Sequence, residues 1–210
     1  MPLKIIKSEL TSVETEAIVY AYTQQPIILF NFNPMIYKKS GQELIASREA
    51  VGTITPGEAK LDPTPRLQSQ QIIHTSAPIW HGGLYQEEQL LQDCYEKVFR
   101  LVAEHQYHSV ALPIIATDHL GYPKKLTQQM AFSCIRTFLA EHPDINVFLV
   151  VPNLAGIMLP GNRYSAVKNH LKNQENKKEQ ILAYCQSQNI QDIYEINQIL
   201  FRFGEEQLEF

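Results

Sequence analysis

The hydrophobic positions form short β-branched runs that alternate with longer segments of helical period. This alternation predicts an α/β fold built in layers. Two runs, SVALPII and NVFLVV, are almost continuously apolar, as expected for central strands that are covered on both faces. The predicted strands are Leu3–Ile6, Ala17–Tyr22, Ala50–Thr55, Gln71–Thr75, Ser109–Ile115 and Asn146–Val151.

Two longer segments have apolar residues at the spacing of an amphipathic helix. In Glu87–His105 these residues are Leu90, Leu91, Cys94, Val98, Leu101 and Val102. In Lys124–Glu141, which follows Pro123, they recur in steps of four as Leu126, Met130, Cys134 and Phe138. Pro34–Ser47 is a further helical candidate that is only partly in phase, and Gly57–Arg66 is predicted to be a loop.

The composition fits one globular domain, or one domain with an appendage. Of 210 residues, 44% are hydrophobic and 19% are charged, so the chain can bury a core without disulfides or a metal. A net charge of −4 disfavours nucleic acid as a partner. Cys94, Cys134 and Cys185 lack metal-binding spacing and are expected to be free thiols. No run resembles a signal peptide or a membrane span, so the expected location is the cytoplasm.

The charge pattern changes in the last quarter of the chain. Residues 161–180 carry five basic and two acidic side chains, whereas residues 181–210 carry one basic and five acidic side chains. The opposite signs would let these halves pair with each other. We therefore predict a domain at residues 1–160 and a helical C-terminal extension at residues 161–210, packed on or beside it. Its charged faces are expected to be solvated, and a partner-binding surface is the alternative.

The candidate chemistry lies in one loop, because the motifs GxxxxGK[ST], GxGxxG, HExxH and GxSxG are missing from the sequence. Residues 116–123 follow the apolar strand that ends at Ile115 and precede a predicted helix. Open α/β sheets bind ligands at such turns, whose backbone amides can converge on an anion. Gly121 would permit the tight turn. An ordinary connection between a strand and a helix is the alternative.

Asp118 and His119 in this loop are the catalytic candidates, since a carboxylate and an imidazole serve in general acid and base catalysis. The alternative is a solvated turn, because neighbours in sequence seldom face the same atom. His74 lies in an apolar run and is expected to be a hydrogen-bonded core residue. No metal site and no cofactor are predicted.

Five segments in chain order resemble the macro domains, a family that binds ADP-ribose and in many members hydrolyses ADP-ribosyl or O-acetyl-ADP-ribose esters. SELT, EAIVYAYT, TPGEAK, IIHTSAPIW and ALPIIATDHLGYP stand where the family has GDIT, DAIVNAAN, TGEA, VIHTVGPVW and FPAISTGVFGYP. The resemblance runs from about residue 3 to residue 153. It implies a three-layer sandwich with a mixed central sheet of about six strands, flanked by helices and followed by the extension.

The resemblance also implies a ligand cleft at the ends of the central strands. Glu9 takes the place of an aspartate that contacts adenine, and the turn 117–122 takes that of a loop that grips the diphosphate. The ligand-binding residues implied are Glu9, Leu10, Thr23, Asn33, Thr117, Asp118, His119, Leu120, Gly121, Tyr122 and Asn153. The implied partner is ADP-ribose or a related nucleotide, and an ADP-ribosylated protein is a further candidate.

The sequence departs from the family pattern in the first phosphate loop. Residues 28–31 (ILFN) replace a run of glycines that lets the backbone approach phosphate, so this loop must adopt another shape. Thr23 replaces the asparagine that positions the distal ribose, and Asn33 replaces the catalytic aspartate of hydrolytic members. An amide cannot accept a proton as a carboxylate does, so activation of water at Asn33 should be lost.

Other departures change the bulk and charge of the implied cleft. Tyr20 and Tyr22 replace an asparagine and an alanine, and strand packing is their alternative role. Pro152, followed by Asn153, stands where an aromatic residue usually stacks on adenine. Asp118 replaces a glycine and would bring a carboxylate beside the diphosphate, which is repulsive.

Three functions follow from these residues. The favoured one is a module that binds ADP-ribose or a related nucleotide without efficient hydrolysis. The second is an ADP-ribosyl or O-acetyl-ADP-ribose hydrolase with relocated catalytic groups such as Asp118 and His119. The third is a degenerate macro fold that acts by protein contact, for example through the segment after Gly161. The first function, nucleotide binding, requires that the backbone N–H groups near Gly121 converge on a space large enough for a pyrophosphate.

Overall fold

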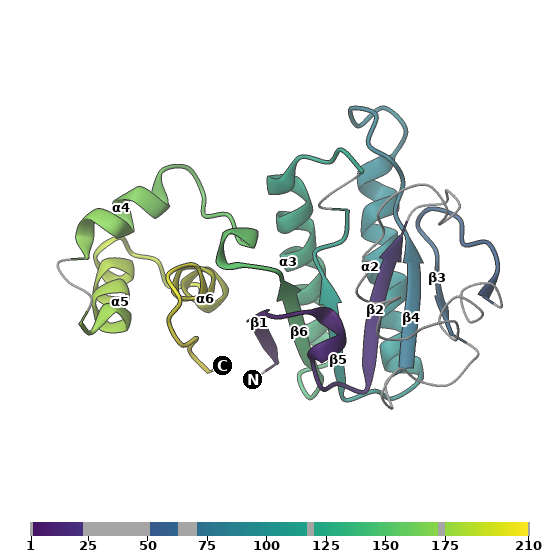
Figure 1. Ribbon diagram of the computed structural model, residues 1–210, viewed down its shortest axis with the longest axis horizontal. Coiled ribbons are helices and arrows are strands. Elements are labelled where there is room, and N and C mark those ends of the chain that lie inside the picture. The colour runs from purple at the N-terminus through teal and green to yellow at the C-terminus, as the bar shows by residue number, and fades with distance from the viewer. Residues whose placement is uncertain (1, 23–50, 63–70, 117–119, 172–174, 210) are drawn as a thin grey trace.

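The computed structural model describes residues 2–22, 51–62, 71–116, 120–171 and 175–209. Strands and helices alternate along most of the chain, and the last three helices follow one another directly (Figure 1). In order, with η for a 3-10 helix, the elements are β1 (Leu3–Lys7), η1 (Leu10–Ser12), β2 (Ala17–Tyr22), β3 (Ala59–Leu61), β4 (Gln71–Ser76), α2 (Glu87–Glu104), β5 (Ser109–Pro113), α3 (Lys124–Glu141), β6 (Asn146–Val151), η2 (Leu154–Gly156), α4 (Arg163–His170), α5 (Lys177–Ser187) and α6 (Ile193–Arg202).

The strands form one mixed sheet of six in the order β1-β6-β5-β2-β4-β3. The first five of these are parallel to one another, and β3 pairs antiparallel with β4 at one edge. The apolar runs of β5 and β6 lie inside the sheet, where both faces are covered, as their sequence predicted. All parallel strands therefore end along the same edge of the sheet, which we call the carboxyl edge.

The main hydrophobic core lies between the sheet and the pair α2 and α3, which pack against each other on one face (Figure 1). A second apolar cluster covers the opposite face. There Leu10 and Val13, around η1, pack with Val51 and Ile54 against side chains of β2 and β4. The prediction of a three-layer α/β sandwich with a mixed sheet of six strands and flanking helices is confirmed.

The buried face of α3 differs from its prediction, although the bounds of the helix agree. Leu126, Met130 and Cys134 of the predicted row are only half-buried, and Met130 and Cys134 border a groove beside α2. Phe138 is buried as predicted, together with Ala131, Phe132, Ile135 and Leu139, which the row did not include. A row of every fourth residue winds slowly around a helix of 3.6 residues per turn, so it cannot mark the centre of the buried face over four turns.

The predicted strand Ala50–Thr55 is wrong for its described residues, and a strand in the predicted loop Gly57–Arg66 was missed. Val51 is helical and Gly52 has φ +70°, a left-handed conformation that no strand residue adopts. The Thr53 carbonyl accepts from Lys60 Nζ at 2.9 Å, not from a neighbouring strand. The real edge strand, β3, has only three residues, too few to show alternation. The helical candidate Pro34–Ser47 lies outside the described residues.

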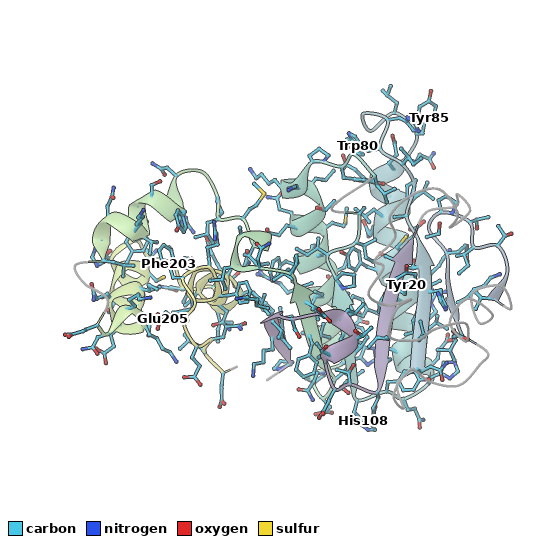
Figure 2. The ribbon with its side chains drawn as sticks, viewed as in Figure 1. Tyr20, Trp80, Tyr85, His108, Phe203 and Glu205 are labelled. Carbon is cyan, nitrogen blue, oxygen red and sulfur yellow. The ribbon has the colours of Figure 1, made fainter. Side chains whose placement is uncertain are left out.

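The C-terminal helices form a small core of their own. Val167, Ile181, Tyr184 and Cys185 pack there with Ile199 and Leu200 of α6. The opposite charges of the two halves do pair, since Lys177 lies 3.4 Å from Glu205, Lys178 lies 3.2 Å from Glu206, and Arg163 contacts Glu195. Figure 2 shows Glu205 and Phe203 in this region.

Helix α6 joins the extension to the sandwich. Its Phe201 packs in the main core, while Ile199 on the same helix packs in the small one. Beyond α6, the Gln207 amide accepts from Ile5 N–H at 2.9 Å and donates to Ile5 C=O at 2.8 Å. One side chain thus occupies the open edge of β1 as a neighbouring strand would. The boundary between residues 160 and 161 remains a prediction.

None of the helices that the structure describes is long and apolar enough to cross a membrane. The location of the protein in the cytoplasm remains a prediction.

Candidate functional site

The carboxyl edge gathers the ends of five parallel strands and the segments that leave them. These segments begin at Ser8 after β1, at Pro152 after β6, at Ile114 after β5 and at Ala77 after β4. In open α/β sheets the ends of parallel strands are where ligands bind, because several connections and their backbone amides meet there. Figure 2 shows Trp80 and Tyr85 at this end of the sheet and His108 at the opposite end.

The β1 and β6 ends are tied together next to Glu9. Ser8 N–H donates to the Val151 carbonyl at 3.2 Å, one step beyond the Lys7–Val151 pair of the sheet. The Glu9 side chain is exposed, and its backbone carbonyl accepts from Ser12 N–H at 3.0 Å to begin η1. Leu10 is buried in the apolar cluster of that face, so its contact with a ligand would be through the backbone.

Asn153 and Pro152 are exposed where β6 ends, directly beside the segment of Glu9. Asn153 begins η2, and its carbonyl accepts from Gly156 N–H at 3.0 Å. An added Cβ at Gly156 would lie 2.9 Å from Val151 Cβ, too close for any side chain. Gly156 therefore lets η2 fold back on the end of β6, which fixes where Asn153 emerges.

The segment after β5 is held in an unusual conformation. Ile115 N–H donates to the buried Tyr95 hydroxyl of α2 at 2.8 Å. The next residue, Ala116, has φ +66°, which costs an alanine about 1 kcal/mol and persists only where the surroundings impose it. Such strain is concentrated at binding sites. Thr117, Asp118 and His119, which follow, lie outside the described residues.

The far side of this turn contains Gly121 between two buried residues. Gly121 is exposed and has φ +76°, so glycine is required there by conformation. The side chains of Leu120 and Tyr122 point into the main core. The Tyr122 hydroxyl donates to the Glu87 carbonyl at 3.0 Å, and burial raises its pKa well above that of a free tyrosine. Of these three residues, Gly121 is the one exposed to a ligand.

Sequence reasoning missed the part of the carboxyl edge that follows β4. Trp80 N–H donates to the Leu120 carbonyl at 2.8 Å, and the centroids of the Trp80 and Tyr122 rings are 4.9 Å apart. Residues 78–86 are thereby attached to the turn that contains Gly121. The sequence signal was the run APIWHGG, which combines an aromatic residue with two glycines, but its partners lie about forty residues away in the chain.

The Glu87 side chain binds the backbone of the same segment, residues 78–86. Its carboxylate is 1% exposed and accepts from His81 N–H at 2.8 Å and from Tyr85 N–H at 2.6 Å. Burial raises the pKa of this carboxyl, but the backbone N–H groups around it lower the pKa by more, so it lies below the usual range. Glu87 is therefore a carboxylate at neutral pH.

Several other candidates have structural roles or are not described. His74 is buried and its Nε2 lies 3.1 Å from Asp62 Oδ2, which confirms a hydrogen-bonded core histidine. Tyr20 is buried, and its ring stands edge-on to that of His74 with the two ring centroids 6.0 Å apart. This agrees with the alternative prediction, in which Tyr20 packs within the strand layer. Tyr22 ends β2, Thr23 and Asn33 lie outside the described residues, and so do residues 28–31.

The three cysteines are unreactive thiols, and the described acidic groups are not placed to bind a metal. Cys94, Cys134 and Cys185 are free thiols, as predicted. Burial raises the pKa of all three, that of Cys134 to about 12, so they are protonated and poor nucleophiles. Within the described ranges, no group of three or more His, Cys, Asp or Glu side chains is placed to hold a metal ion.

Known proteins are similar to this chain in sequence. The sequence profile of the macro domain family matches residues 33–131. An O-acetyl-ADP-ribose deacetylase of Cronobacter sakazakii is 32% identical over 146 residues, which are 68% of this chain and 81% of that protein. The chain belongs to the macro domain family. The resemblance of its five segments is thereby confirmed.

Solved macro domains agree with this one in fold. A point mutant of the Oceanobacillus iheyensis macrodomain with ADPR matches with a TM-score of 0.63 and 27% identity, over 73% of this chain and 87% of that chain. The macrodomain of the same organism with ADP matches with a TM-score of 0.60 and 28% identity, over 71% and 82% of the two chains. More than a quarter of this chain lies outside each of these matches.

Proposed function

We propose that this macro domain binds ADP-ribose, or a related adenine nucleotide, along its carboxyl edge and hydrolyses esters of ADP-ribose poorly or not at all. The observation that carries the proposal is the order of the sheet: Glu9 and Asn153 are exposed just after the adjacent strands β1 and β6, and the turn that contains Gly121 follows the next strand, β5. Relatives with ADPR and with ADP support a nucleotide of this class.

The proposed orientation places adenine at the β1 and β6 end. There the exposed Glu9 carboxylate accepts a hydrogen bond from the adenine amino group, which has no equivalent in hypoxanthine. The diphosphate binds at the turn that follows β5, which requires glycine at Gly121 because of its φ of +76°. The distal ribose then extends toward β2, since that strand comes next after β5 in the sheet.

Isothermal titration calorimetry with ADP-ribose tests the proposal. We expect saturable one-to-one binding, and weaker binding of the inosine analogue because it lacks the amino group that faces Glu9. Absence of heat at high ADP-ribose concentration would favour the degenerate fold that acts by protein contact.

A second candidate function is deacetylation of O-acetyl-ADP-ribose, because the relative that is 32% identical carries that activity in its name. Asn33 in place of the catalytic aspartate argues against it, since an amide does not activate water. Release of acetate from O-acetyl-ADP-ribose decides between the two. We expect no turnover above the blank, and turnover that His119→Ala abolishes would instead assign catalysis to a relocated group.

A further inference from the structure

Residues 78–86, which we call the β4 loop, expose an unusual group of apolar side chains. Ile79 is 41% exposed, Leu84 is 80% exposed and Tyr85 is 68% exposed. Within the described part of the chain, five large hydrophobic side chains are exposed, and these three lie within seven residues of one another. Single exposed apolar residues are common, but a group of them on one segment marks a contact surface.

The β4 loop is fixed in shape from both ends. The Glu87 carboxylate binds the backbone N–H groups of His81 and Tyr85, at 2.8 and 2.6 Å. Between them, Gly82 and Gly83 have φ +89° and +81°, and an added Cβ at Gly83 would lie 3.2 Å from the Trp80 ring. Leu84 and Tyr85 are therefore held outward by a preformed backbone, which reduces the entropy lost on binding a partner.

The β4 loop is also joined to the proposed nucleotide site. The hydrogen bond from Trp80 N–H to the Leu120 carbonyl and the contact of the Trp80 and Tyr122 rings lie on either side of Gly121. Because the sheet order is β1-β6-β5-β2-β4, a nucleotide with adenine at β1 has its distal ribose toward β2 and β4. In the proposed orientation, a group attached to that ribose would extend toward the β4 loop.

We propose that Ile79, Leu84 and Tyr85 form a docking surface for the polypeptide that carries the ADP-ribose, contacting apolar residues that flank the modified side chain. This inference rests on the proposed function and names the partner of the same site. It follows that the macro domain binds a modified polypeptide more tightly than free ADP-ribose. The difference should depend on the sequence around the modification.

The test compares three ligands by calorimetry. They are free ADP-ribose and two peptides that carry one ADP-ribose through a hydrolysis-resistant linkage, with leucine and valine or with glycine and serine as flanking residues. We expect the peptide with apolar flanks to bind about tenfold more tightly than the other two ligands. Equal affinity for all three ligands would overturn the docking surface and leave the proposed function intact. Binding of none of them would overturn both.

Variants assign the preference to the β4 loop. Leu84→Ser together with Tyr85→Ser should leave affinity for free ADP-ribose within about twofold and remove the tenfold preference for the apolar peptide. Both side chains are largely exposed, so folding should be unaffected. Met158→Ser, which replaces a 42% exposed residue between η2 and α4, is the matched control and should keep the preference.

Sedimentation of the unliganded protein tests a different occupant. We expect a monomer whose state does not change in the Leu84→Ser/Tyr85→Ser variant. A dimer that this double variant dissociates would assign the surface to a second copy of the chain and overturn the proposal.

Discussion

The two ends of the carboxyl edge are built differently. At the β1 and β6 end, the exposed groups are the polar side chains of Glu9 and Asn153, which emerge from short 3-10 turns. At the β4 end, Leu84 and Tyr85 are exposed, and a buried carboxylate holds their backbone. A polar end suits recognition of a base by hydrogen bonds, whereas a rigid apolar end suits contact with a polypeptide. The difference fits our proposal that the polar end binds the nucleotide and the apolar end binds the polypeptide that carries it.

The C-terminal extension contacts the polar end. Leu154 of η2 lies under Gly204, which follows α6, and Gln207 binds the backbone of β1. Within the sandwich, the Gln128 side chain of α3 binds both backbone groups of Met158, in the segment after η2, at 2.7 and 2.8 Å. These contacts hold the β1 and β6 ends where Glu9 and Asn153 emerge, while the β4 end is held from within the sandwich.

Replacing the glycine between the two ends should have the largest effect. Gly121→Val forces a β-branched residue to φ +76°, which costs about 1–2 kcal/mol, and displaces the amides of the turn. We expect ADP-ribose binding to be abolished in calorimetry. Gly161→Val, at φ +54° with open space around it, carries similar strain in the extension and should bind as the wild type does. Equal loss in both variants would show that the effect is a general loss of stability.

Glu9→Gln should weaken binding at the polar end alone. The glutamine amide oxygen still accepts from the adenine amino group, but a hydrogen bond to a charged acceptor is stronger by about 1 kcal/mol, so we expect affinity for ADP-ribose to fall about fivefold. The factor should be the same for AMP, because the contact is with adenine. Glu14→Gln, an exposed acid after η1, is the control. A loss for ADP-ribose without a loss for AMP would place Glu9 at the other end of the ligand.

Asp118→Gly should strengthen binding by a few-fold. The carboxylate beside the diphosphate is repulsive by about 1 kcal/mol or less if it is exposed, and added salt should reduce the gain. Titrations at low and high ionic strength measure both effects. Asp144→Gly, at the opposite end of the sheet, should change nothing. Weaker binding in Asp118→Gly would show that this carboxylate contacts the ligand favourably.

Acid should loosen the β4 loop through Glu87, with the smallest effect of the four. The folded pKa of Glu87 lies below its unfolded value near 4.5, so its stabilising contribution is complete above that pH and is lost as the pH falls through the folded pKa. Trp80 is the only tryptophan of the chain, so its fluorescence reports on this loop. We expect its emission to change in acid before the far-ultraviolet circular dichroism does. In Glu87→Gln the early change should be missing.

The sequence predicted the layers well because they depend on local pattern. Five strands and both long helices were located, since each carries a run of apolar residues with a clear period. The strand predicted at Ala50–Thr55 failed because β-branched residues around Gly52 gave a strand-like composition to a helical residue and a left-handed turn. The sequence did not predict β3, because this segment is a strand through its pairing with β4 and not through a pattern of its own.

The site was only half predictable. Glu9 and Gly121 follow from motif position, because a macro domain places those residues at strand ends. The network of Trp80, Leu120, Tyr122 and Glu87 does not follow, since its bonds join segments about forty residues apart and depend on how α2 leaves the carboxyl edge. Tyr122 is a predicted ligand-binding residue whose buried hydroxyl donates to the backbone of α2, so any contact with the ligand would be through its backbone.

A crystal structure of the complex with ADP-ribose tests the central claim most directly. The account predicts adenine beside Glu9 and Asn153, the diphosphate on the amides that precede Gly121, and the distal ribose directed toward the β4 loop. A nucleotide bound in the reverse direction or on another face would contradict it. So would a carboxyl edge that, at saturating ADP-ribose, is occupied by the protein's own side chains.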